Sequence, residues 1–177
     1  MYNRRFTPDR IEHLNKNEVF VFGSNLAGQH GGGAARIAYG EFGAIWGQGV
    51  GMQGQSYAIP TMHGGVAEIK PYVDQFIEYA KQHPDLVFLV TRIGCGIAGF
   101  SDEQIAPLFK EAIDVENIIL PHDFVVCLSF ADFCDATSLV SEQQQISKTV
   151  IVAIITITIA IAIGAYILFK IYCAYNS

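Results

Sequence analysis

Residues 19–38 read VFVFGSNLAGQHGGGAARIA and decide the fold. Four apolar residues open the stretch without a polar interruption, which predicts a central strand buried on both faces. The loop that follows contains Ser24, Asn25, Gly31, Gly32 and Gly33. Good helix formers then resume at Ala34. A strand, a glycine loop and a helix start present backbone N–H groups to which a phosphate can bind, although such turns also occur as plain connections.

A second glycine turn lies further along the chain. Residues 86–90, LVFLV, predict another buried strand, and residues 94–100, GCGIAGF, follow it. Residues 56–60 and 117–120 predict short strands, and residues 69–80 predict a helix with one apolar face. This order indicates an α/β fold with a mostly parallel sheet. Because ligands bind outside the carboxyl ends of parallel strands, one phosphate-bearing ligand could lie between the two turns.

Other segments of this part are less regular. Residues 1–17 predict a turn that leads into a brief helix. Residues 43–55 are rich in glycine and predict a long surface loop, which could serve as a lid or as a mere connection. Ser101 and Gln104 match the capping box of a helix start. Pro107 would remove a helical hydrogen bond, which favours a later start.

The apolar excess of the chain lies at its C-terminus. The sequence has 177 residues, of which 51% are hydrophobic and 16% are charged. Residues 149–169 carry no charge and are bracketed by Lys148 and Lys170, so they are long enough to cross a hydrocarbon core of about 30 Å. A buried core helix is the alternative. Small residues four apart within the segment favour helix association, unless they only face lipid. They are Thr156, Ala160 and Gly164.

These patterns divide the chain into four parts. We expect a ligand-binding domain at residues 1–124, a connector at 125–147, a transmembrane helix at 148–171 and a short tail at 172–177. The first thirty residues contain no apolar run typical of a signal peptide. We therefore expect a single-pass protein of the cell inner membrane whose N-terminal domain faces the cytoplasm.

Charge and cysteine content exclude some function classes. The net charge of −6 disfavours broad electrostatic attraction to nucleic acid. The cysteines do not show the spacing of a zinc site, and a cytosolic domain would keep them reduced. Cys127 and Cys134 lie near aspartates, but no histidine joins them. The sequence therefore predicts no metal and no cofactor.

The two glycine turns resemble those of a macro domain, the α/β module that binds ADP-ribose. Ser24-Asn25 followed by the glycine run is similar to the first loop of that family, and residues 94–100 are similar to the second. The resemblance covers about residues 1–124. It implies a compact three-layer α/β/α fold with a mixed, mostly parallel sheet. The ligand-binding residues that it implies are Asp9, Ser24, Asn25, Gly31, Gly32, Gly33, Gly94, Cys95, Gly96, Ile97, Ala98, Gly99 and Phe100.

The resemblance also implies a role for each segment. Residues 94–99 would wrap a diphosphate with backbone amides, and Asn25 with the glycine run would face the distal ribose. Phe100 or the loop around Trp46 would pack near that ribose, and Asp9 would hydrogen-bond the adenine. An Asp after Pro can equally be a turn residue or a helix cap.

Relatives that remove ADP-ribose often carry an acidic residue just after the glycine run, where this chain has Ala34-Ala35-Arg36. Without that acid, general-base catalysis lacks its usual group, so the sequence predicts no catalytic residue. His30 is a substitute base by its place in the first loop, although loop histidines more often hydrogen-bond or face solvent.

A ligand-binding head joined to a membrane segment resembles effectors of Thoeris-type antiphage systems. This resemblance implies a sensor that binds an ADP-ribose-derived signal, such as the product of a TIR enzyme. Binding would drive oligomers through the head and the transmembrane helix and so disrupt the lipid membrane. Two alternatives remain open. One is a membrane-tethered hydrolase of ADP-ribose esters or nucleotides, and the other is an anchor that recruits ADP-ribosylated proteins.

Overall fold

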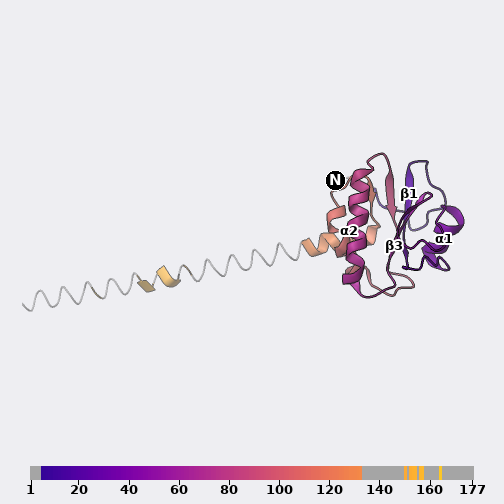
Figure 1. Ribbon diagram of the computed structural model, residues 1–177. Helices are drawn as coiled ribbons and strands as arrows, with labels where there is room; N and C mark the ends of the chain where they lie inside the picture. The colour runs from indigo at the N-terminus through magenta and orange to yellow at the C-terminus, as the bar shows by residue number, and fades with distance from the viewer. Residues whose placement is uncertain (1–4, 133–149, 151, 155, 158–163, 165–177) are drawn as a thin grey trace, which may run out of the picture. The chain divides into compact units, whose positions relative to one another are not determined.

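The computed structural model describes residues 5–132, 150, 152–154, 156–157 and 164 (Figure 1). The chain divides into two compact units, Met1–Phe130 and Ala131–Ser177. The description below concerns the first unit, which contains the strands and both glycine turns. Most of the expected transmembrane helix at residues 148–171 lies outside the described residues. Among the residues that are described, no helix is both long and apolar enough to span a bilayer.

A mixed five-stranded sheet forms the centre of the first unit, in the order β2-β3-β1-β4-β5. The central strand β1 (Glu18–Ser24) pairs in parallel with β3 (Ser56–Pro60) on one side and with β4 (Val87–Val90) on the other. β5 (Ile118–Ile119) is parallel to β4, and β2 (Gly51–Gln53) is antiparallel to β3. The expected α/β fold with a mostly parallel sheet is confirmed.

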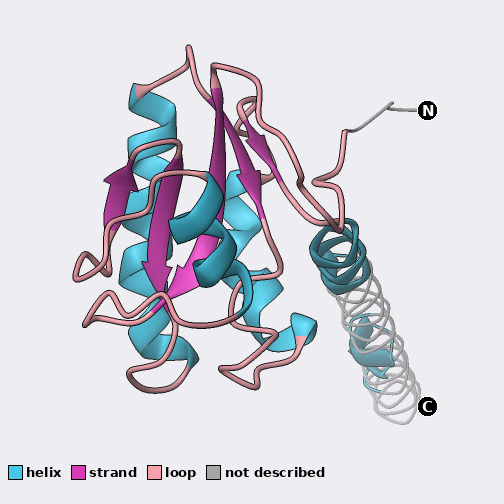
Figure 2. Cartoon of the chain, turned by 90° about the vertical axis from the view of Figure 1, so that its right-hand side faces the viewer, coloured by secondary structure: helices cyan, strands magenta, loops and turns pink. Residues whose placement is uncertain are grey.

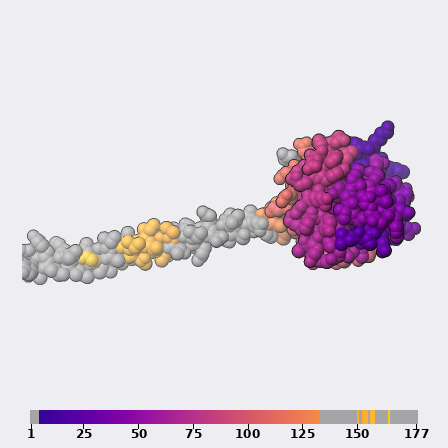
Figure 3. Space-filling view, viewed as in Figure 1, coloured from indigo at the N-terminus to yellow at the C-terminus, as the bar shows by residue number. Residues whose placement is uncertain are grey.

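Successive side chains along a strand point to opposite faces of the sheet, and both faces of this sheet are buried. Val19 and Val21 of β1 enter one apolar core, and Phe20 and Phe22 enter the other. The helices are α1 (Gly33–Glu41), α2 (Val66–Gln82), α3 (Asp102–Ile105) and the 3₁₀ helix η1 (Ala106–Ala112). α1 covers the phenylalanine face, and α2, α3 and η1 cover the valine face. Figure 2 shows the sheet between helices, and Figure 3 shows the surface over α2 with that over α1 beside it.

Local chemistry explains where the helices begin and end. α2 buries one stripe of apolar residues against the sheet and ends at Gln82, with His83 as its C-cap just before Pro84. α3 begins after Ser101, whose backbone N–H donates to Gln104 Oε1 at 3.0 Å, so the capping box starts the helix where expected. The expectation that Pro107 delays this start is wrong. The α-helix instead ends at Ile105 and continues as η1, whose first turn accepts the proline.

Two other segments differ from expectation, and the segment after residue 121 contains a helix. The brief helix expected before residue 17 does not form within the described residues 5–17. Residues 43–55 are not all loop, because β2 forms there and pairs with β3. Residues 122–132 are helical, and Leu128 packs into the apolar core with only 3% of its surface exposed. The boundary drawn at residue 124 therefore falls inside a helix of the first unit.

Candidate functional site

The two glycine turns follow neighbouring parallel strands and lead to opposite faces of the sheet. The first glycine loop (residues 25–32) runs from β1 to α1, on the phenylalanine face of the sheet. The second glycine loop (residues 91–101) runs from β4 to α3, on the valine face. Such a divergence between adjacent parallel strands opens a crevice at their carboxyl ends, where α/β proteins bind ligands. A cavity of about 540 Å³ lies there.

The cavity brings together most of the residues that the sequence singled out. Asp9, Ser24, Asn25, Gly32, Gly33, Gly94, Gly96, Ile97 and Ala98 line it. Gly31, Cys95, Gly99 and Phe100 do not belong to its lining. Thr61 and Met62, which follow β3, and Arg92 are lining residues that sequence reasoning missed. A position directly after a parallel strand is the signal that could have found them.

Asp9 reaches the cavity because the N-terminal segment pairs with the edge of the sheet. The Thr7 backbone N–H donates to the Leu120 carbonyl at 3.0 Å, and Thr7 Oγ1 donates to the Ile119 carbonyl at 2.7 Å. Thr7 also forms an isolated parallel bridge with Pro121. This pairing places residues 7–11 at the carboxyl end of β5, and Asp9 is the carboxylate of the cavity lining.

Backbone N–H groups from both loops remain available at the cavity. Gly32 is the N-cap of α1 and has no side chain that could satisfy the first turn, so the N–H groups of Gly33, Ala34 and Ala35 have no acceptor among the residues that the structure describes. In the second loop, the Phe100 N–H donates to the Gly94 carbonyl at 3.0 Å and closes a turn. Within the described part of the chain, the N–H groups of residues 96–98 have no acceptor. Donors of this kind, beside a helix N-terminus, favour an anion.

The second loop depends on glycine at two positions. Gly94 and Gly99 have φ angles of 76° and 80°, which residues other than glycine rarely adopt. A Cβ on Gly94 would also lie 3.1 Å from Ile105 Cδ1. Gly96 differs, because a Cβ there would meet nothing within 4 Å. A side chain at position 96 would therefore extend into open space at the crevice.

Asn25 holds the shape of the first loop. Its Nδ2 donates to the Gln29 carbonyl at 2.7 Å, and its Oδ1 accepts from the Gln29 N–H at 3.1 Å. Both atoms of the amide are thus engaged with the backbone four residues on. Asn25 lines the cavity, but its side chain first serves to brace the loop that would contact a ligand.

His30 lies inside the molecule and not in the cavity lining. Its ring is 1% exposed, and Nε2 donates to the carbonyls of Ile45 and Gln48, each at 3.1 Å. Two carbonyl acceptors require that Nε2 carries a proton. His30 therefore joins the first glycine loop to residues 45–48, which supports a structural role and not the role of a substitute base. None of residues 43–55 lines the cavity, so the loop around Trp46 does not act as its lid in this structure.

Two glycines allow the two loops to pack closely at this junction. A Cβ on Gly28 would lie 2.3 Å from the Gln48 nitrogen, and a Cβ on Gly49 would lie 2.0 Å from the Asn25 carbonyl oxygen. The Gly47 N–H also donates to the Gly28 carbonyl at 2.9 Å. Backbone packs directly on backbone here, a contact that a one-sequence pattern does not reveal.

Arg92, one of the charged residues in the cavity lining, is already paired. Arg92 Nε donates to Asp102 Oδ1 at 3.0 Å, its second terminal nitrogen donates to the other carboxylate oxygen, and Asp123 lies 3.4 Å from Nε. The Arg92 hydrogen bond lowers the pKa of Asp102 and keeps it ionised. Burial and a hydrogen bond to Asp102 raise the pKa of Cys95 to about 12, so this thiol is a poor nucleophile.

The site can therefore bind an anion through backbone amides, and its charged lining residues are Asp9, Arg10 and the paired Arg92. Among the described residues, no group of histidine, cysteine and carboxylate side chains could hold a metal ion. Comparisons with protein-family models, with curated proteins and with solved structures found no match to this chain.

Proposed function

We propose that the first unit binds a nucleotide diphosphate of the ADP-ribose class in the crevice between the two glycine loops. One observation carries the proposal: in the described part of the chain, the N–H groups at the start of α1 and at residues 96–98 have no acceptor, and these residues line one cavity at the carboxyl ends of β1 and β4. A diphosphate would accept these hydrogen bonds, and the cavity volume of about 540 Å³ lies in the range of small-molecule sites.

The ADP-ribose class rests on the resemblance of both loops to those of a macro domain. In this proposal, the unit is a compact three-layer member of that fold. Asp9 lies at the same cavity and could accept a hydrogen bond from the amino group of a base. Ile37, Met62 and Ile97 supply apolar surface, each with more than a third of its area exposed in the absence of ligand.

We further propose that the whole chain is a membrane-anchored sensor. The uncharged segment at residues 149–169 would anchor it, and the ligand would act as a signal made elsewhere by an enzyme such as a TIR protein. Signal binding would favour assembly of the heads, with association of the anchors and damage to the membrane, in antiphage defence. A ligand can drive this step only by binding the assembled state more tightly.

Calorimetric titration of the full chain in detergent with ADP-ribose tests the binding step. We expect Gly96→Val to abolish binding without lowering the thermal midpoint, because its side chain would fill open space at the crevice. Gly31→Val is the matched control, since residue 31 also has open space around it but does not line the cavity. Equal loss in both variants, or no binding by the natural chain, would contradict the proposal.

The same sample separates the sensor from a hydrolase. A sensor should leave ADP-ribose esters intact over hours. Steady turnover that is lost in Asp9→Asn would instead favour a membrane-tethered hydrolase, because Asp9 is the carboxylate among the lining residues.

A further inference from the structure

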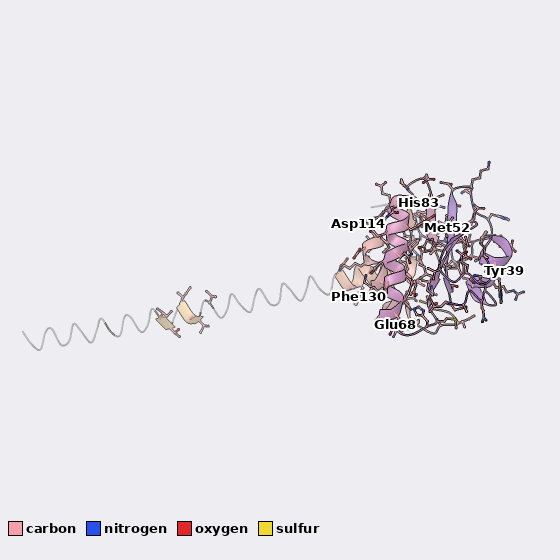
Figure 4. All side chains as sticks on the ribbon, in the orientation of Figure 1. Tyr39, Met52, Glu68, His83, Asp114 and Phe130 are labelled. Atoms are coloured by element: carbon pink, nitrogen blue, oxygen red, sulfur yellow. The ribbon has the colours of Figure 1, made fainter. Side chains whose placement is uncertain are left out.

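An exposed apolar surface lies beside α1, away from the residues that line the cavity. Leu26, Tyr39, Ile45 and Trp46 expose between 50% and 54% of their surface. None of the four lines the cavity. We call these four residues the aromatic face. Tyr39 is labelled on α1 in Figure 4.

The four residues lie on segments that contact one another. The rings of Tyr39 and Trp46 meet edge to face with their centroids 5.7 Å apart. Ile45 precedes Trp46, and the backbone of Leu26 touches the same loop, because a Cβ on Gly49 would lie 2.8 Å from the Leu26 carbonyl oxygen. Exposed apolar side chains that gather on one part of a surface can mark an interaction site, and tryptophan and tyrosine are enriched among the residues that dominate the binding energy of such sites.

The segments that build this face carry almost no charge. Residues 19–55 contain two charged side chains, Arg36 and Glu41, which are exposed, lie on α1 and have opposite signs, and their histidine, His30, is buried. The chain as a whole has a net charge of −6. Two copies could therefore approach through this face without opposing like charges directly.

We propose that the aromatic face is where the heads of two copies of this chain pair. An apolar patch is complementary to itself, as a two-fold interface requires. A membrane surface is a weaker occupant, because residues 19–55 offer a single cation, Arg36, to anionic lipid. Gly40 adds a further observation. It lies in α1, and a Cβ there would meet nothing within 4 Å, so packing inside this chain does not require a glycine.

α1 and His30 connect the aromatic face to the candidate ligand site. α1 lines the cavity with its first turn and carries Tyr39 near its end. His30 connects the first glycine loop to the backbone of Ile45 and Gln48. A ligand that orders the first loop would order the pairing face as well. This inference rests on the proposed function in taking assembly of the heads as the response to the ligand.

Trp46 is the single tryptophan of the chain and reports on the face directly. The experiment measures acrylamide quenching of Trp46 and light scattering for the full chain over a dilution series at constant detergent. We expect quenching to fall about twofold or more as dimers form. Ile45→Glu and Leu26→Glu should raise the concentration for half-assembly about tenfold or more, because each buries a charge in the interface.

Phe130→Glu is the control, because Phe130 is 68% exposed on the helix at residues 122–132 and is labelled far from Tyr39 in Figure 4. Assembly of both glutamate variants as in the natural chain would overturn the inference. Quenching that stays constant while scattering rises would also overturn it, as would quenching of Trp46 by brominated lipid after reconstitution. Calorimetry with ADP-ribose separates the two proposals, since Ile45→Glu should still bind ligand even though its heads do not pair.

Discussion

The side chain of Ile97 covers Gly32 so closely that a Cβ on Gly32 would lie 2.8 Å from Ile97 Cδ1. Gly32 is the N-cap of α1, and Ile97 lies at the tip of the second glycine loop with 70% of its surface exposed. The two loops therefore touch across the crevice. Because Ile97 is mostly exposed and is not part of either apolar core, a shift of its side chain would not disturb them.

Gly32→Ala should weaken ligand binding while leaving the fold intact. The new methyl group would push Ile97 toward the diphosphate position, and we expect about a tenfold loss of affinity for ADP-ribose by calorimetry. The free energy of unfolding should fall by about 1 kcal/mol or less, the cost of a poorer N-cap. Gly31→Ala is the control, because its methyl group would meet nothing within 4 Å. An affinity loss of the same size in Gly31→Ala would contradict this account.

Gly49→Ala should destabilise the first unit by about 1–3 kcal/mol, because its methyl group would collide with the Asn25 carbonyl, which belongs to the backbone and cannot rotate away. The midpoint of urea unfolding, followed by Trp46 fluorescence, measures the change. Gly40→Ala should do the opposite and stabilise by about 0.5–1 kcal/mol, since it replaces a helical glycine in open space. A neutral Gly49→Ala would mean that the two loops separate easily.

His30→Ala should cost about 2–4 kcal/mol of unfolding free energy. It would leave the carbonyls of Ile45 and Gln48 without a donor and open a cavity beside Phe22, whose ring lies 5.3 Å from the imidazole. His30→Gln should recover part of the loss, because an amide can still donate to these carbonyls. His13→Ala, at an exposed position, provides the baseline. Urea unfolding that does not distinguish His30→Ala from His13→Ala would refute the structural role.

The free energy of unfolding should depend on pH through the titration of Asp102. The Arg92 hydrogen bond lowers the pKa of Asp102 from its ordinary 3.8, so the folded state favours the ionised carboxylate. That stability is present above pH 3.8 and is lost as pH falls through the lower folded value. Because Arg92 is half exposed, the pair should contribute only about 0.5–1 kcal/mol.

Urea midpoints of the natural chain and of Asp102→Asn measure this effect between neutral and strongly acid solution. At neutral pH the variant should be the less stable of the two. At a pH below the range in which Asp102 titrates, the two midpoints should converge, because the natural chain then carries a neutral carboxylic acid at this position. A difference that stays constant with pH would show that Asp102 acts through packing or helix capping alone.

The strands and helices that carry a strong period were readable from the sequence. The buried runs at β1 and β4, the apolar stripe of α2 and the capping box at Ser101 each form locally where expected. Short elements were not readable: β2 and the helix at residues 122–132 owe their place to partners distant in the chain. The continuation of α3 as a 3₁₀ helix through Pro107 is likewise a product of packing, since Leu108 and Phe109 enter the core.

The sequence by itself determined the α/β order of elements and the two glycine loops after buried strands, because buried runs, glycine and helix formers act through local backbone preference. Only the tertiary structure decided which residues share the crevice. It placed β4 beside β1, brought Asp9 to the edge of the sheet and removed Cys95 and Phe100 from the lining. It also turned His30 away from the cavity to hold a second loop. Those outcomes depend on strand pairing and on backbone contacts between segments far apart in the chain, and spacing along one segment does not encode them.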